Sequence, residues 1–156
     1  MFELTSATEI SAPAETVWRI LTDFDGYADW NPFIVRASGS ARIGGEVHLR
    51  VRSSMGVHLR FHATVTDHQQ NHELRWRGQL LSRAVAAGEH VFSIEPTGTA
   101  RVRFVQHEIF RGALPLLFES LLERETRRGF DAMNHALRAR AEREATATPR
   151  ESRAWS

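Results

Sequence analysis

The stretch V57-H-L-R-F-H-A-T-V65 decides the fold of this 156-residue chain, because apolar and polar side chains alternate along its whole length. A period of two is typical of a β-strand that buries one face and exposes the other. The same rhythm continues in the runs 47–52, 74–80, 90–95 and 101–108. Turn-forming residues, such as Gly44-Gly45 and the PTGT of 96–99, separate the runs. The pattern predicts an antiparallel meander with one apolar and one polar face.

The residues before the meander predict one more strand and two short helices. Phe2–Ile10 alternates weakly and is interpreted as the first strand. Pro13 and Glu15 mark the start of a helix that ends near Thr22-Asp23. The segment 23–33, DFDGYADWNPF, is too rich in Asp, Gly and Pro for a long helix and predicts one helical turn.

A long helix is predicted from Pro115 to about Glu144, because its apolar residues recur at helical spacing. The stripe consists of Leu114, Leu117, Phe118, Leu121, Leu122, Phe130, Met133 and Leu137. No other predicted helix is long enough to cover the apolar sheet face. We therefore predict an α+β fold in which a curved seven-stranded antiparallel sheet wraps around this helix. Residues 1–144 form one domain, and 145–156 are expected to be a disordered tail.

Composition excludes several classes of chemistry. The chain has no cysteine, and all 20 of its basic residues are arginine, so thiolate sites and lysine Schiff bases are impossible. The net charge of +1 gives no overall attraction to nucleic acid. No leader pattern and no apolar run of about 18 residues is present. We expect a cytoplasmic protein, without stable membrane insertion or a nucleic-acid partner, as a monomer or homodimer.

Three polar side chains fall on the apolar face by alternation, namely His90, Gln106 and Glu108. A loop at Thr97-Gly98-Thr99 would place His90 opposite Gln106, with Glu108 one inward position further along. His90 and Glu108 would then form a hydrogen-bonded pair, suited to general acid/base work. Alternatively, the polar groups only satisfy one another or orient a ligand. The residues leave both interpretations open.

The eight histidines do not predict a metal site. None forms the H-E-x-x-H pattern of a zinc helix. His58 and His62 share one strand face, about 13 Å apart. We expect neither a metal nor another cofactor.

The polar face of the sheet is predicted to be rich in arginine. The residues that point outward are Arg50, Arg52, Arg60, Arg75, Arg77, Arg101 and Arg103, with His48, His58 and His62. Such a face could contact an acidic partner, or it could simply be a solvated surface.

Several segments together resemble a known superfamily. They are ISAPAETVW at 10–18, DFDGYADWNPF at 23–33, GEHVFSIEP at 88–96, FVQHEIFRG at 104–112 and GFDAMN at 129–134. They resemble the SRPBCC superfamily, which contains START domains, the birch-pollen allergen and polyketide cyclases. The chain is most similar to the small bacterial polyketide cyclase/dehydrase and lipid-transport group. The resemblance implies a helix-grip fold and a cavity for a small apolar ligand.

The resulting hypothesis is that the protein binds or transports a small hydrophobic or lipid-like molecule between sheet and helix. The residues expected to line the site are Trp30, Phe33, Phe61, Trp76, Phe92, Phe104, Phe130 and Met133. His90, Gln106 and Glu108 are expected to orient the polar end of the ligand. One alternative is a cofactor-independent polyketide cyclase or dehydratase, with His90 and Glu108 as its acid/base groups. Another is a protein-interaction module that uses the arginine-rich face.

Overall fold

A seven-stranded antiparallel sheet forms the body of the protein, as the alternation predicts. The computed structural model describes residues 1–80 and 82–147. The strand order is β1-β7-β6-β5-β4-β3-β2. The strands are β1 (Phe2–Ile10), β2 (Ile34–Gly39), β3 (Glu46–Arg52), β4 (His58–Gln69), β5 (Glu73–Leu80), β6 (Ala86–Gly98) and β7 (Arg101–Arg111). The predicted α+β class and the single long covering helix are confirmed.

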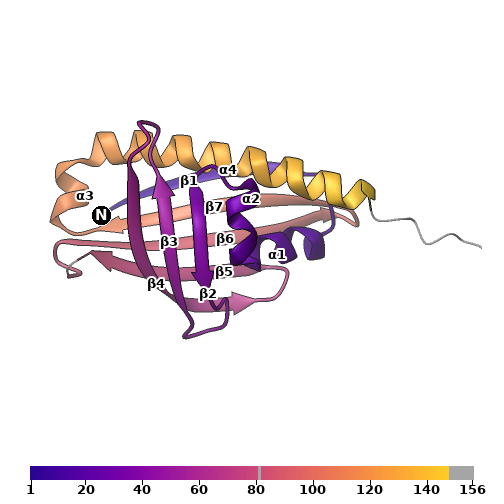
Figure 1. Cartoon of the computed structure of the whole chain (residues 1–156), viewed down its shortest axis with the longest axis horizontal. Coiled ribbons are helices and arrows are strands. Elements are labelled where there is room, and N and C mark those ends of the chain that lie inside the picture. Colours follow the sequence, from indigo (N-terminus) through magenta and orange to yellow (C-terminus); the bar gives the residue numbers. More distant parts are fainter. Residues whose placement is uncertain (81, 148–156) are drawn as a thin grey trace, which may run out of the picture.

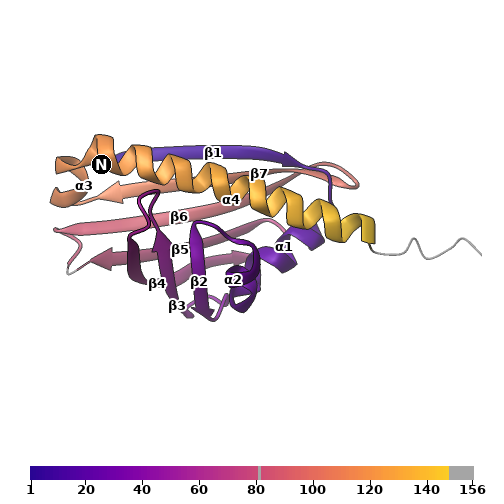
Figure 2. The ribbon, with the colours of Figure 1, turned by 45° about the horizontal axis from the view of Figure 1, so that its top comes forward.

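The sheet curls into a half-barrel, and a helix lies along its open side. In Figure 1, β2, β3 and β4 cross in front of β5, β6 and β7, so the viewer looks at the convex face of the front strands. The helix α4 (Glu119–Ala147) runs across the opening, and the short helix α3 (Ala113–Leu117) precedes it (Figures 1 and 2). The concave face is therefore enclosed between the sheet and α4.

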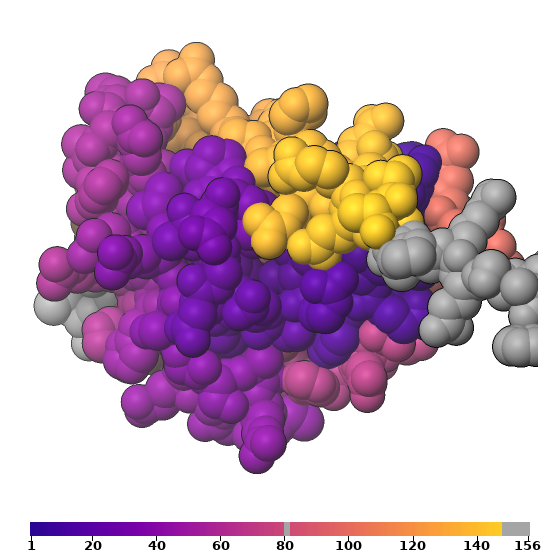
Figure 3. Space-filling view, turned by 45° about the vertical axis from the view of Figure 1, so that its right-hand side comes forward, coloured from indigo at the N-terminus to yellow at the C-terminus, as the bar shows by residue number. Residues whose placement is uncertain are grey.

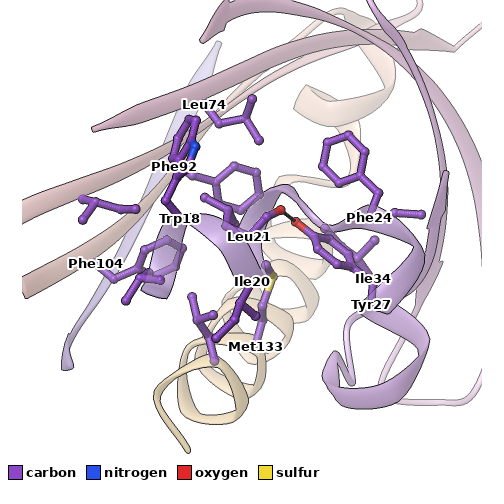
Figure 4. Packing of buried hydrophobic residues seen from close by; sticks show 14 of the residues in the cluster. Trp18, Ile20, Leu21, Phe24, Tyr27, Ile34, Leu74, Phe92, Phe104 and Met133 are labelled. Atoms are coloured by element: carbon purple, nitrogen blue, oxygen red, sulfur yellow. Dashed lines mark hydrogen bonds between the residues drawn. The ribbon is translucent and has the colours of Figure 1, made fainter. Parts of the chain in front are cut away.

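Three short helices fill one end of the half-barrel. They are α1 (Ala14–Thr22), the single 3-10 turn η1 (Phe24–Gly26) and α2 (Tyr27–Trp30). Figure 4 shows their apolar side chains packed against the sheet and α4. The Tyr27 hydroxyl donates a hydrogen bond of 2.5 Å to the carbonyl of Leu21. Burial, reinforced by the charge of Asp23, raises the pKa of Tyr27 far above its usual range, so this donor stays protonated.

The C-terminal part of α4 closes the same end. Figure 3 shows this part packed against the N-terminal segment of the chain. Arg19 of α1 forms an ion pair of 2.8 Å with Glu144 of α4. Leu137 and Ala141 of α4 are fully buried in the shared core. This end of the half-barrel is therefore solid.

Two predicted pairings are wrong by two residues. The turn between β6 and β7 contains only Thr99 and Ala100, because Gly98 pairs with Arg101 and the register shifts between Pro96 and Gly98. As a result His90 lies opposite Glu108, and not opposite Gln106. Pairing Val65 with Leu74 across the turn would predict Phe61 opposite Gly78, but Gln69 pairs with Glu73, and after a one-residue shift between Val65 and Asp67 it is Ala63 that lies opposite Gly78. Because both errors are of two residues, an even number, they leave the inward face of each strand unchanged.

The predicted C-terminal helix is interrupted near its start. Phe118 leaves the helical region, with φ −113° and ψ 25°, and separates α3 from α4. The α4 helix then continues to Ala147, three residues beyond the predicted boundary at 144. The rest of the predicted tail, 148–156, lies outside the described residues.

Gly129 brings α4 close to the residues that lead into β2. A Cβ atom at this position would stand only 2.1 Å from Cδ2 of the Phe33 ring and 2.7 Å from its Cγ. Because the clash reaches the root of the ring, the whole Phe33 side chain would have to move. Glycine is therefore required here by packing, since Gly129 has no unusual φ.

We predict that Gly129→Ala lowers the stability of the protein, although alanine is favoured over glycine inside a helix by about 1 kcal/mol. Overpacking against Phe33 is expected to outweigh that gain, with a net loss of about 1 kcal/mol or more. Thermal unfolding should show Tm lowered by about 2–4 °C. The double variant with Phe33→Leu should recover most of the loss, and a Tm that rises in Gly129→Ala alone would contradict the explanation.

Candidate functional site

A cavity of about 520 Å³ lies at the end of the half-barrel opposite the helices α1 and α2. Its walls come from β3 to β7, from α3 and from the first turns of α4. Most of the lining side chains are apolar, for example Phe33, Leu49, Phe61, Trp76 and Phe130. The cavity is large enough for a small organic molecule. One half of the concave face is therefore packed solid, and the other half is hollow.

The structure places six of the predicted site residues on the cavity wall. They are Phe33, Phe61, Trp76, His90, Glu108 and Phe130. Of the others, Phe92, Phe104 and Met133 are fully buried in the core, and Trp30 packs against the same core. Gln106 is also completely buried, but it contacts His90 from behind the wall. Alternation had identified the inward face correctly without separating its packed half from its hollow half.

His90 and Glu108 form a close pair at the border between the core and the cavity. The distance from His90 Nδ1 to Glu108 Oε2 is 2.7 Å, and the side chains are only 6% and 13% exposed. The imidazole stacks on Phe92 with a centroid distance of 4.1 Å. The rings of Phe130 and Trp76 lie at 5.0 and 5.6 Å. These aromatic neighbours hold the imidazole in one orientation.

A chain of hydrogen bonds continues from His90 behind the cavity wall. His90 Nε2 lies 3.1 Å from Gln106 Oε1. The Gln106 amide donates to Asn134 Oδ1 at 2.8 Å, and the Asn134 amide donates to Ser6 Oγ at 3.0 Å. Ser6 donates to Asp131 Oδ1 at 2.6 Å. The chain therefore links β6, β7, α4 and β1.

Two acceptors fix the direction of this chain. The Asp131 carboxylate requires the Ser6 hydroxyl as a donor, and the carbonyl of Phe130 accepts a second bond of 3.4 Å from Gln106 Nε2. Gln106 must then present its oxygen to His90, so His90 Nε2 carries a proton. The short contact between His90 Nδ1 and Glu108 Oε2 consequently holds one proton, shared between an imidazole and a carboxylate.

Within the His90–Glu108 pair, Glu108 Oε1 is the polar atom that remains available to a ligand. Both ring nitrogens of His90 are engaged, and Oε1 has no hydrogen-bond partner among residues 1–80 and 82–147. Gly88 makes room for it, because a Cβ atom there would lie 2.6 Å from Oε1. The sequence analysis did not assign this role to Gly88, although Gly88 occupies an inward position of β6.

The mouth of the cavity is surrounded by exposed apolar side chains. They come from the β3–β4 hairpin and from the segment of α3 and the start of α4, and they are Met55, Val57, Leu59, Leu114, Phe118 and Leu121. The predicted apolar stripe of the C-terminal helix is thus partly exposed at its beginning. It surrounds an opening there because the hollow half of the sheet offers it no packing partner.

A polar contact fastens the β3–β4 hairpin to α4 beside this mouth. Glu125 of α4 accepts hydrogen bonds from the backbone N–H of Ser54 at 2.9 Å and from its hydroxyl at 2.8 Å. These bonds, followed by the charges of Arg128 and Arg124, lower the pKa of Glu125 despite an opposing contribution from desolvation. We call this contact the Glu125 latch. The Met55-Gly56 turn belongs to the hairpin that this latch holds.

The described residues contain neither a metal-ligand cluster nor a membrane-spanning helix. Within 1–80 and 82–147, no group of three His, Asp or Glu side chains is arranged to hold a metal ion. No helix in that part of the chain has the length and apolar character needed to cross a membrane.

Comparison with solved structures supports the fold assignment. A START superfamily protein from Mycobacterium smegmatis superposes with a TM-score of 0.75 at 23% identity, over 91% of this chain and 98% of the other. The Zhui aromatase/cyclase from Streptomyces sp. R1128 gives a TM-score of 0.78 at 21% identity, over 94% and 96%. The di-domain ARO/CYC StfQ from the steffimycin biosynthetic pathway gives 0.73 at 13% identity, over 93% and 52%.

These identities establish a shared fold and leave the activity open. A comparison with curated proteins gives no significant match. The sequence profile of one family, described as "Polyketide cyclase / dehydrase and lipid transport", matches residues 1–142. Since that match spans nearly the whole chain and agrees with the cavity and the half-barrel, the protein belongs to the polyketide cyclase/dehydrase and lipid-transport family.

Proposed function

We propose that the protein binds a small, mainly apolar molecule that carries one hydrogen-bond donor, such as a hydroxyl or phenol group. The observation behind this proposal is the free oxygen of Glu108, in the buried His90–Glu108 pair, on the wall of a mainly apolar cavity. Whether the shared proton resides on His90 or on Glu108 Oε2, Oε1 can only accept a hydrogen bond. A ligand that offers a donor satisfies this atom, whereas a ligand without one leaves it buried and unpaired.

The cavity wall and Glu108 are expected to contribute differently to binding. Burial of apolar ligand surface contributes about 25 cal/mol per Å² and supplies most of the affinity. A hydrogen bond to a charged group contributes about 1.5–3 kcal/mol and selects the orientation. Phe33, Phe61, Trp76 and Phe130 would therefore hold the ring or chain of the ligand, and Glu108 its donor.

A second candidate function, cofactor-independent acid/base catalysis of a cyclisation or dehydration, is favoured by the proton between His90 and Glu108. A carboxylate supported by an imidazole can take a proton from the carbon beside a carbonyl group and return it to a departing hydroxyl. Binding and catalysis use the same side chains here. They differ in one respect, because catalysis requires the shared proton to move during the reaction and binding does not.

A matched pair of ligands tests the donor requirement. We predict that 2-naphthol binds at least about tenfold more tightly than its methyl ether, because only the naphthol donates to Glu108. In Glu108→Met, which has no acceptor oxygen at this position, the preference should fall to within a few-fold. Glu125→Gln, which changes another carboxylate on the cavity wall, should keep it. Titration by tryptophan fluorescence measures all six combinations of the three proteins and two ligands, and equal affinities of the two ligands for the unmodified protein would refute the proposal.

The direction of the hydrogen-bond chain can be tested by NMR of the imidazole nitrogens. We predict that His90 Nε2 stays protonated throughout the pH range in which the protein is folded. In Gln106→Leu this restriction should be lost, while Thr126→Val, another buried change at the cavity, should preserve it. An unprotonated Nε2 in the unmodified protein would contradict the assigned direction.

The Glu125 latch predicts a pH-dependent opening of the mouth. Because the pKa of folded Glu125 is lowered, the latch is fully present above the ordinary glutamate pKa of about 4.3 and is lost as the pH falls through the lowered value. Uptake of 2-naphthol, followed by stopped-flow fluorescence, should accelerate in that acidic range. Glu125→Gln should be fast already at pH 7, while Glu123→Gln, an exposed carboxylate on the same helix, should behave like the unmodified protein. A rate that does not depend on Glu125 would exclude the latch.

A further inference from the structure

The two halves of the convex face of the sheet differ in whether their arginines form ion pairs. On the half formed by β5, β6, β7 and β1, Arg75, Arg77, Arg101 and Arg103 all form ion pairs with glutamates. Burial alone would lower the pKa of Arg75, but the hydrogen bonds that Arg75 donates to Glu73 and the charges of Glu73, Glu89 and Asp67 raise it. These four arginines are therefore neutralised by neighbouring carboxylates.

The half formed by β2, β3 and β4 carries arginines without such partners. The strand register places Arg36 opposite Arg50 and Arg50 opposite Arg60, so three guanidinium side chains form a row across three adjacent strands. We call them the arginine row. Among residues 1–80 and 82–147, no carboxylate oxygen lies within 4.0 Å of their nitrogens. Like charges directly opposite each other destabilise a sheet.

Two histidines extend the row on one side. His48 lies opposite His62, and their rings meet edge to face with a centroid distance of 4.5 Å. Together with the arginine row they line a hollow of about 540 Å³ on the convex surface. Asp25 is the acidic side chain on its rim, and Glu46 lies one outward position beyond His48. The hollow therefore gathers three permanent positive charges and up to two more from the imidazoles.

We propose that this hollow is a binding site for a multiply charged oxyanion, namely the phosphate or diphosphate group of a small soluble molecule. Guanidinium groups bind phosphate oxygens in bidentate geometry, and neighbouring strands about 4.8 Å apart space the three side chains at the scale of a diphosphate. A bound anion would also remove the repulsion within the arginine row. The site is separate from the cavity, because its polar side chains project from the opposite face of the sheet.

A membrane surface and an acidic protein are less suitable occupants. None of the exposed large apolar side chains of the described chain lines the hollow, so nothing there would insert into a bilayer. The charges are also recessed in a hollow and not spread over a flat face, which suits a small ligand better than a protein partner. This argues against our earlier alternative of an interaction module based on the whole arginine-rich face.

Isothermal titration with pyrophosphate, with inorganic phosphate as a second probe, tests the site. We expect one pyrophosphate per chain with a Kd below about 1 mM, weakening as NaCl is raised. Arg50→Gln and Arg60→Gln should each weaken binding at least tenfold, and Arg50→Lys by less. Arg101→Gln, an ion-paired position on the same convex face, should bind within twofold of the unmodified protein, and so should Glu108→Gln.

Thermal unfolding supplies a second readout that does not depend on measurable affinity in the variants. Without ligand, Arg50→Gln should raise Tm by about 1–3 °C, because it relieves like-charge repulsion. Pyrophosphate should raise Tm of the unmodified protein and not that of the variant. Three results would overturn the proposal: no saturable binding, equal binding in all variants, or binding to phosphatidic acid vesicles without binding to pyrophosphate.

Discussion

The structure depends on a mismatch between the width of one helix, α4, and the width of the curled seven-stranded sheet that it has to cover. The α4 helix packs closely against the sheet only where α1, η1 and α2 fill the remaining space. Beyond them the same helix spans a trough with no further element to occupy it. The resulting cavity follows from the number and length of the elements, and its position is set by the place where the three short helices end.

The His90–Glu108 pair lies at the boundary that this mismatch creates. On one side the imidazole stacks on Phe92 of the packed half, and on the other the carboxylate faces open volume. A polar pair in the solid half would have no access to a ligand. A pair deep in the hollow half would lack the rings that orient the imidazole. At the border, packing can fix the orientation of a buried polar pair while a ligand can still contact it.

Much of this architecture could be predicted from the sequence, because alternation reports directly on which face a side chain occupies. Inward positions such as His90 and Glu108, and outward ones such as Arg50 and Arg60, were identified in this way. Their partners were not, because the positions of the turns, together with one-residue shifts between Pro96 and Gly98 and between Val65 and Asp67, set the register and leave no mark on hydropathy. The arginine row depends on the pairing of β2, β3 and β4, with a further shift between Ile34 and Arg36, and Arg36 was not identified as an outward residue. Core and cavity residues have the same apolar character, which is why Phe92 and Phe130 could not be distinguished beforehand.

The hydrogen-bond chain from His90 to Asp131 also limits how protons can travel. Asp131 is exposed on α4, so the chain joins the interior to bulk water, but two of its members, Gln106 and Asn134, are carboxamides. A carboxamide fixes the orientation of its hydrogen-bond partners. It relays protons poorly, because proton transfer through it would require a high-energy imidic acid. Glu108 must therefore exchange its proton through the mouth of the cavity, along the same route that a ligand takes. A molecule that seals this route also isolates the acid from solvent for as long as it stays.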